Sequence, residues 1–267
     1  MLWDTHMHCK FSGDSEAEPE AMIDAARQKG LGGICFTDHL DYDFPSDPPG
    51  LFELDLAQYE AEMLSLKDKY EATFPVYHGI ELGVQPHLHK KLQEVVNHYQ
   101  FDQVICSSHV VDGIDLYYKD FYVGKEEQEA YLAYFTSILE NLDGFTDFDV
   151  YGHIDYVVRY GPNTNKYYSY EAYKDVLDAI LQKLVSLGKG IEINTGGFKY
   201  GLGHPNPTED ILKRYRELGG EIITIGADAH EPKYVGYAFE KVTPILINTG
   251  FRYFTVFQER KPVFLPL

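Results

Sequence analysis

Histidines and carboxylates in this 267-residue chain gather at the ends of short apolar segments. Six of the eleven histidines and two acidic residues fall there, namely His6, His8, His39, Glu81, His109, His153, Asp228 and His230. Imidazole nitrogens and carboxylate oxygens are ligands for zinc and for other divalent transition metals. Because buried ionisable groups are costly unless they are paired or bind a metal, this set predicts a metal centre rather than a polar core.

The spacing of two pairs strengthens this interpretation. His6 and His8 are separated by one residue on an expected strand, so both side chains point to the same face and can reach one ion. Asp228 and His230 have the same spacing and could act from the opposite wall.

Four other histidines are expected to be structural: His78, His87, His89 and His98. His78 lies in the middle of an expected strand, and the other three lie on or near a helix. His87 and His89 copy the one-residue spacing, but residues two apart on a helix point to different faces.

Short apolar strands alternate with amphipathic helices, and these elements must position the candidate ligands. The expected strands are 2–8, 32–40, 74–82, 103–111, 148–154, 190–195 and 221–227. The expected helices are 19–28, 56–71, 86–98, 126–142, 170–187 and 208–218. Seven such units without a linker or repeat predict one α/β domain over residues 1–267, a parallel barrel. In these barrels the carboxyl ends of the strands share one face, where catalytic groups gather.

Two other segments have expected roles. The connection 41–55 is rich in proline, aspartate and phenylalanine, and a connection that long in a compact domain is usually functional. Segment 252–264 is expected to form a strand pair, turned near 260–262, that covers an end of the barrel.

Composition limits the classes of partner. The formal net charge is −19, and no Lys/Arg cluster is dense enough to form a basic groove, so nucleic acid is not an expected partner. Three cysteines, an odd number without a CxxC pair, favour a reducing compartment over a disulfide framework. No secretory signal or membrane-spanning run is visible, so we expect a cytoplasmic protein that does not enter a membrane.

Other catalytic motifs fit poorly. Ser107-Ser108-His109 lacks the GxSxG turn of a serine nucleophile, and Gly201-Leu202-Gly203 lacks the third glycine of a dinucleotide fingerprint. No GxxxxGK[ST] loop is present. A nucleophilic cysteine at Cys9 or Cys106 stays possible, although only the candidate metal ligands surround either residue.

Motifs along nearly the whole chain resemble, in order, those of the polymerase-and-histidinol-phosphatase (PHP) superfamily. They are Asp4-Thr5-His6-Met7-His8, Ser12-Gly13-Asp14-Ser15, Phe36-Thr37-Asp38-His39, Gly79-Ile80-Glu81, Ser108-His109, Gly152-His153-Ile154-Asp155 and Gly226-Ala227-Asp228-Ala229-His230. Residues 37–43, the stretch Ile191-Glu192-Ile193-Asn194-Thr195 and the length are most similar to the monofunctional histidinol-phosphate phosphatase branch. The resemblance implies a distorted, TIM-barrel-like (β/α)7 barrel that holds up to three metal ions.

The resemblance also implies a set of ligands for each ion. One ion would be held by His6, His8, Glu81 and Asp228, and a second by Glu81, His109 and His153. The third would be held by Asp14, His39 and His230. Some relatives have histidine where this chain has Asp14, and a carboxylate is a harder ligand, so zinc, iron and manganese all remain candidates.

The activity implied is hydrolysis of L-histidinol phosphate to L-histidinol and phosphate in histidine biosynthesis, with a water activated by the ions as nucleophile. Glu81, Asp228 and His230 would be catalytic, and His230 or a water on the metal would protonate the leaving group. Arg159, Lys199 and His204 are the candidates for substrate binding, although Lys199 stands where an arginine is expected. Asp38 and Asp155 are expected to fix the tautomers of ligand histidines.

Three alternatives stay open. A related phosphoesterase could act on another small phosphomonoester or a nucleotide, and a regulatory protein could retain the metal site without turnover. An amidohydrolase on a similar barrel usually carries a bridging lysine, and none is visible here. The sequence does not predict the oligomeric state.

Overall fold

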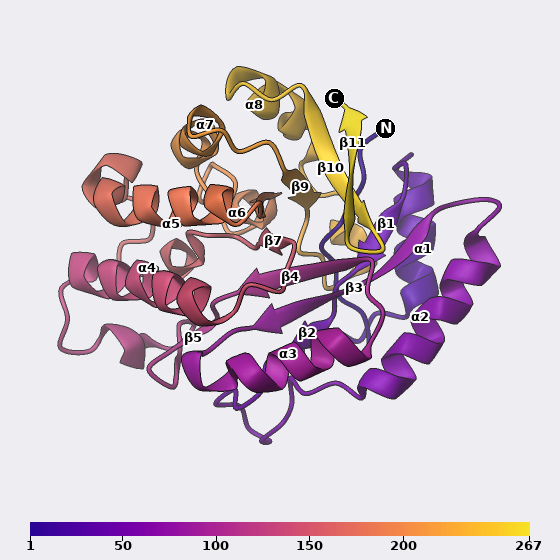
Figure 1. Ribbon diagram of the computed structural model, residues 1–267, viewed down its shortest axis with the longest axis horizontal. Coiled ribbons are helices and arrows are strands. Elements are labelled where there is room, and N and C mark those ends of the chain that lie inside the picture. The colour runs from indigo at the N-terminus through magenta and orange to yellow at the C-terminus, as the bar shows by residue number, and fades with distance from the viewer.

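The computed structural model describes all 267 residues, and its centre is a curled sheet of parallel strands (Figure 1). The strands lie in the order β1 (Ile34–Phe36), β3 (Val76–Gly83), β4 (Gln103–Ser107), β7 (Val150–Tyr151), β8 (Gly190–Asn194) and β9 (Ile223–Gly226). A short strand, β2 (His39–Leu40), continues the chain beyond β1 and also pairs with β3. The predicted α/β barrel is therefore confirmed.

The amino-terminal segment lies between the first and last strands of this sheet. Asp4 forms a parallel bridge with Ile34 of β1, and Met7 forms one with Ala229, just after β9. The N–H of Cys35 donates to the Asp4 carbonyl, and the N–H of Thr5 donates to the Ile225 carbonyl. The hydrogen bonds go to both neighbours without a continuous ladder, so the predicted strand 2–8 appears as bridges only. Its position nevertheless brings His6 and His8 between β1 and β9.

Helices surround the sheet on the outside (Figure 1). They are α1 (Pro19–Gln28), α2 (Leu56–Tyr70), α3 (His89–His98), α4 (Glu127–Gly144), α5 (Lys174–Ser186), α7 (Glu209–Glu217) and α8 (Val242–Asn248), with a single turn at α6 (Gly196–Lys199). Local sequence fixes several starts: Asp55 accepts a hydrogen bond from the N–H of Gln58 at 3.0 Å, and Glu126 and Glu129 form a capping box at α4. Two helices predicted from 86 and 170 begin instead with 3₁₀ turns, Pro86–Leu88 and Tyr170–Tyr173. No helix is long and apolar enough to span a bilayer.

Side-chain alternation separates core from site along the strands. In β8, Ile191 and Ile193 belong to the main hydrophobic cluster of 63 buried residues, whereas Glu192 points the other way, toward His6. In β3, Ile80 and Leu82 join the same cluster, and Glu81 faces the barrel interior. The polar groups of the centre therefore lie on the face of the strands opposite to the helices.

Two hairpins lie outside the parallel sheet. The predicted strand 103–111 ends at Ser107, and the chain then forms the antiparallel pair β5 (Val110–Val111) and β6 (Ile114–Asp115). Its turn, Asp112-Gly113, has positive φ at both residues, a conformation that Asp-Gly favours. At the carboxyl terminus, β10 (Tyr253–Gln258) and β11 (Lys261–Pro266) form the expected strand pair. Arg260 in its turn binds Asp149, just before β7, so the pair covers the amino end of the barrel as predicted.

Candidate metal centre and substrate cavity

The predicted ligands converge from segments far apart in the sequence. His39 and Glu81 lie on β2 and β3, His109 and His153 follow β4 and β7, and the remaining members come from the amino-terminal segment or from the chain after β9. Most members are buried: His6, His8, Glu81, His109, His153 and Asp228.

Glu81 lies at the centre of this group. Its Oε1 lies 2.9 Å from His153 Nε2 and 3.3 Å from His109 Nε2. Its Oε2 lies 3.0 Å from His39 Nδ1, 3.2 Å from His6 Nε2 and 3.5 Å from His8 Nε2. One carboxylate thus faces two sets of imidazoles, as a bridging ligand between two ions would.

Asp228 completes one of these sets. Its Oδ1 lies 3.5 Å from His8 Nε2 and 3.8 Å from His6 Nε2. These side chains and Glu81 are the four predicted ligands of the first ion. The three predicted ligands of the second, Glu81, His109 and His153, also bring one ligand atom each within 4.8 Å of the others.

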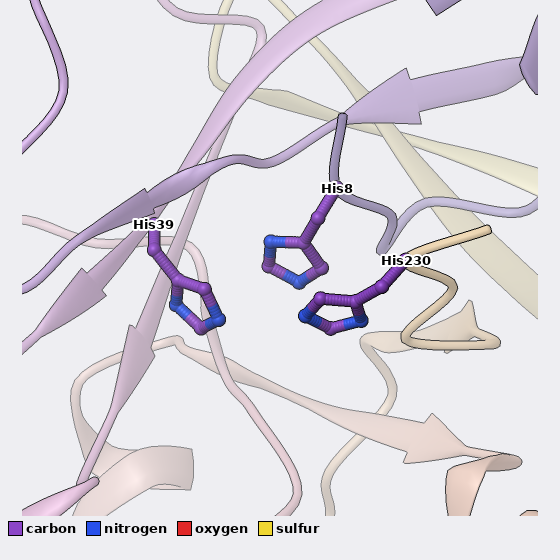
Figure 2. A group of neighbouring side chains, drawn as sticks. All are labelled: His8, His39 and His230. Atoms are coloured by element: carbon purple, nitrogen blue, oxygen red, sulfur yellow. The ribbon is translucent and has the colours of Figure 1, made fainter. Parts of the chain in front are cut away.

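A third group contains His8, His39 and His230, whose rings approach one another from three separate segments (Figure 2). The ring centroid of His8 lies 4.2 Å from those of both His39 and His230. Asp14 Oδ2 lies 3.0 Å from His230 Nε2 and 3.9 Å from His39 Nε2. The structure therefore brings Asp14, His39 and His230 together as predicted, with His8 between the two histidines.

Asp41 is a member of the centre that the sequence reasoning did not select. Its Oδ1 accepts a hydrogen bond from His109 Nδ1 at 2.7 Å, and its Oδ2 lies 3.2 Å from His39 Nδ1. Asp41, His39 and His109 also have ligand atoms within 4.8 Å of one another. Its place two residues after His39, at the start of the 41–55 connection, was the available signal.

Glu192 was also missed. It is buried in β8, and its Oε1 accepts a hydrogen bond from His6 Nδ1 at 2.7 Å, which turns the lone pair of Nε2 toward Glu81. An acidic residue between Ile191 and Ile193 in a buried strand was the signal for this position, because it must point away from the helices.

Electrostatics indicate that this cluster requires positive charge. Several buried nitrogen and oxygen atoms face one another without a hydrogen bond, among them His6 Nε2, His8 Nε2, His39 Nδ1, Asp41 Oδ2 and Glu81 Oε2. Burial by itself lowers the pKa of His39, but Glu81 and Asp14 outweigh this effect and raise it to about 9. Burial and the neighbouring His230 and His39 lower the pKa of His8 to about 3, so that this ring is neutral. Divalent cations would satisfy these lone pairs, and the nitrogen and oxygen donors suit zinc and its neighbours in the transition series.

Of the two carboxylates expected to fix tautomers, only Asp38 is linked to a ligand histidine, through Ser12. Asp38 accepts a hydrogen bond from Ser12 Oγ at 2.9 Å, and Ser12 Oγ lies 3.1 Å from His8 Nδ1. Asp155 accepts instead from Asn206 Nδ2 at 2.6 Å and from the N–H of Thr208 at 3.0 Å. Asp155 therefore supports Asn206 rather than a ligand histidine.

Arg159 is held in the wall of the cavity by three side chains. Its Nη1 donates to Asp228 Oδ2 at 2.9 Å, its Nε to Asn206 Oδ1 at 2.9 Å and its Nη2 to Asn194 Oδ1 at 3.0 Å. A guanidinium has five N–H groups, so two remain for a ligand. The predicted phosphate anchor is thus buried, oriented and only partly satisfied within the chain.

The other two predicted substrate contacts have different surroundings. Lys199 lines the same inner cavity as Arg159, and its Nζ lies 4.3 Å from the ring centroid of Tyr234. His204 is not among the residues that line this cavity or the adjoining one, and its Nδ1 donates to the Pro205 carbonyl. The structure therefore does not bring His204 together with the other site residues.

Two connected cavities open on the centre. The inner one, of about 260 Å³, is lined by Arg159 and Lys199 as well as by Asp228 and His230. The outer one, of about 360 Å³, is lined largely by the 41–55 connection and by tyrosines. Both cavities share Asp14, His39, His109, Tyr156, Tyr160 and Tyr200. Together they could accommodate a small molecule with its anionic end at the centre.

Comparison with known proteins shows that this chain is similar to one protein family and to several full-length relatives. The PHP domain family matches residues 4–196. The histidinol-phosphatase of Lactococcus lactis is 32% identical over 262 residues, covering 97% of this chain and 95% of the relative. A probable histidinol-phosphatase of Clostridium acetobutylicum is 33% identical over 264 residues, covering 98% of each.

Solved structures agree with the sequence matches. The L. lactis histidinol phosphate phosphatase, in complex with zinc, L-histidinol and phosphate, superposes with a TM-score of 0.90 over 98% of both chains at 32% identity. A putative histidinol phosphatase from Listeria monocytogenes has a TM-score of 0.79 at 18% identity, covering 90% of this chain and 99% of its own, and shares the fold.

Proposed function

This chain belongs to the PHP domain family, and on that premise we propose that it hydrolyses L-histidinol phosphate to L-histidinol and phosphate. The observation that carries the proposal is the full-length match to a relative whose structure holds zinc, L-histidinol and phosphate. The buried cluster of histidines and carboxylates supplies the site that such a reaction needs.

We propose that the site holds up to three divalent ions, which would be zinc, iron or manganese. The ligands would be His6, His8, Glu81 and Asp228 for the first ion, Glu81, His109 and His153 for the second, and Asp14, His39 and His230 for the third. Asp41 lies between the last two groups and adds a carboxylate. When bound, the ions would supply a nucleophile from water near neutral pH and would neutralise charge on phosphoryl oxygens.

The chain itself would bind and orient the phosphoryl group. Arg159 is held by Asp228, Asn194 and Asn206, so its two remaining N–H groups are preorganised for phosphoryl oxygens. Lys199 adds a second positive charge to the inner cavity. Preorganised donors stabilise charge that develops in the transition state without reorganising.

His230 is our candidate for the proton donor to the leaving oxygen. It is the most exposed histidine of the centre, with 20% of its side chain accessible. Its Nδ1 contacts the Asp228 carbonyl, and its Nε2 faces Asp14 Oδ2 at 3.0 Å. A nitrogen bound to a metal has no proton to give, so the ligand and acid roles of Nε2 exclude each other at any one step.

Phosphate release from a substrate panel tests this function. L-histidinol phosphate should be favoured by a wide margin over nucleotides and sugar phosphates, and release should vanish in His8→Ala and Glu81→Gln variants that remain folded. A flat profile would favour a broader phosphomonoesterase, and a metal-loaded but inactive protein would favour the regulatory alternative.

We place the reaction in the cytoplasm because all three cysteines are buried and unpaired.

A further inference from the structure

The outer cavity differs in charge from the inner one. Arg159 and Lys199 line the inner cavity, whereas no lysine or arginine lines the outer one. Aromatic side chains form much of the outer wall: Phe44, Phe52, Tyr117, Tyr118, Tyr156, Tyr160 and Tyr200. A ligand that spans both cavities would therefore meet cations at one end and an aromatic, acidic chamber at the other.

Asp115 is the unusual member of the outer wall. Asp115 is the last residue of β6, and only 7% of its surface is exposed. Its Oδ1 accepts a hydrogen bond from the N–H of Tyr117 at 2.8 Å. This backbone N–H is the one donor to the carboxylate, and no lysine, arginine or histidine forms an ion pair with it. The carboxylate faces the cavity with one hydrogen bond, from the N–H of Tyr117, so its second oxygen is left to accept from a cationic ligand.

The other carboxylates in the same wall are accounted for. Asp14 contacts His230, and Asp41 contacts His109 and His39. Asp47 is exposed to solvent in the 41–55 connection. Asp115 is thus the one buried carboxylate of this cavity that lacks a partner of opposite charge.

The β5–β6 hairpin brings Asp115 close to the metal centre. Asp115 pairs with Val110 across the hairpin, and the N–H of Leu116 donates to the His109 carbonyl at 3.3 Å. The carboxylate therefore lines the outer cavity together with His109, a proposed metal ligand, whereas Arg159 lines the inner cavity.

We propose that Asp115 determines substrate specificity by binding the protonated amino group of the substrate while the phosphoryl group lies at the centre. This inference rests on the proposed function and deepens it: the enzyme selects phosphomonoesters whose organic part carries a primary ammonium group. The ammonium supplies the missing partner of the carboxylate, and the aromatic wall receives the imidazole body of the same molecule.

The proposal is tested by comparing two proteins, the wild type and Asp115→Asn, each on two substrates that differ only in the amino group. Asp115→Asn keeps an oxygen for the N–H of Tyr117 and removes the charge. The two substrates are L-histidinol phosphate and the imidazolylpropyl phosphate that lacks only the amino group. The wild type should favour the amino substrate by about 10- to 100-fold in kcat/KM, the value of one charge-assisted hydrogen bond, and Asp115→Asn should abolish most of that preference. The loss should appear mainly in KM.

Asp112→Asn is the matched control, because Asp112 lies in the turn of the same hairpin, is exposed and lines neither cavity. It should retain the wild-type preference. Equal activity of the wild type on both substrates overturns the inference without any variant. An Asp115→Asn enzyme that keeps the preference for the amino substrate, or that loses activity equally on both substrates, also overturns it. If the wild type does not favour L-histidinol phosphate over p-nitrophenyl phosphate, the proposed function fails as well.

Discussion

Glu192 accepts a 2.7 Å hydrogen bond from His6 Nδ1 across 186 positions of sequence. Its other oxygen accepts from the N–H of His153 at 3.0 Å, so a single carboxylate orients segments that carry ligands of two proposed ions. Hydrogen bonds of this kind fix the tautomer of a ligand histidine and raise its basicity. Glu192 is therefore a positioning residue of the centre.

Replacing Glu192 with Gln should lower metal affinity by about 10- to 100-fold while leaving the fold intact. Glutamine retains an oxygen that can accept from His6 but removes the charge that supports the lone pair on Nε2. Metal content after dialysis against a graded chelator series measures the effect. Glu221→Gln, an exposed change of the same charge just before β9, is the control. Wild-type metal retention in the Glu192 variant would contradict the assigned role.

The sequence predicts the parallel barrel and the convergence of eight candidate ligands at strand ends because both depend on local patterns, whereas Asp14 was selected only by the family resemblance. Strand ends are visible in the apolar runs, and parallel topology collects those ends on one face. The partners Glu192 and Asp41 escape prediction because their role depends on which side chains meet across the barrel. Asp155 shows the converse: its place next to Ile154, after His153, predicts a histidine partner, but its oxygens bind Asn206 and Thr208.

The β5–β6 hairpin shows where local signals compete. Residues 103–111 read as one apolar run, yet the parallel strand ends at Ser107. The Asp112-Gly113 turn draws Val110 and Val111 into antiparallel pairing instead. His204 shows the limit of assigning roles within a loop, because its ring contacts the Pro205 carbonyl outside the lining of both cavities.

His230→Asn should slow hydrolysis only of substrates whose leaving group must be protonated, if His230 is the general acid. Loss of a general acid should reduce kcat on L-histidinol phosphate by about 100-fold or more, because an alkoxide leaves poorly without a proton. p-Nitrophenyl phosphate releases a stable phenolate, so its turnover should fall much less. Equal losses on both substrates, accompanied by loss of metal, would instead indicate that His230 serves only as a ligand.

Arg159→Lys should reduce kcat/KM by about 100-fold, because lysine supplies a point charge without the forked donors that reach Asn194, Asn206 and a phosphoryl oxygen together. Inorganic phosphate should also become a weaker inhibitor. Arg214→Lys, which changes a surface pair with Asp178, controls for the general effect of the substitution. Unchanged phosphate inhibition in Arg159→Lys would remove this residue from the phosphate site.

Removing the metals should abolish phosphate release and lower the midpoint of thermal unfolding by about 10 °C. Without cations, the acceptor atoms around Glu81 face one another in a buried space, which destabilises the folded state. Calorimetry before and after chelation, with zinc, manganese and iron added back separately, measures both effects. Full activity in protein shown by elemental analysis to contain none of these metals would contradict the proposed centre.

His78 should make stability depend on pH independently of the metals. This buried ring lies between Tyr59 and Phe101, its Nδ1 donates to the Gln100 carbonyl at 3.0 Å, and its Nε2 has no partner. Burial disfavours the charged ring and lowers its pKa to about 4. The unfolded chain, with a histidine pKa of about 6.5, binds the proton first as the pH falls.

The contribution of neutral His78 is therefore fully present above about pH 6.5 and is lost as the pH falls toward about 4. The full loss would be about 3 kcal/mol, of which about 2 kcal/mol would be gone by pH 5. Denaturant unfolding of the chelated wild type and of chelated His78→Gln between pH 7.5 and 5 isolates this residue, because the other titrating groups are common to both. Glutamine keeps a donor for the Gln100 carbonyl and does not titrate, so the variant should lose less stability over this range than the wild type. Parallel pH profiles for the two proteins would show that His78 is not the group responsible.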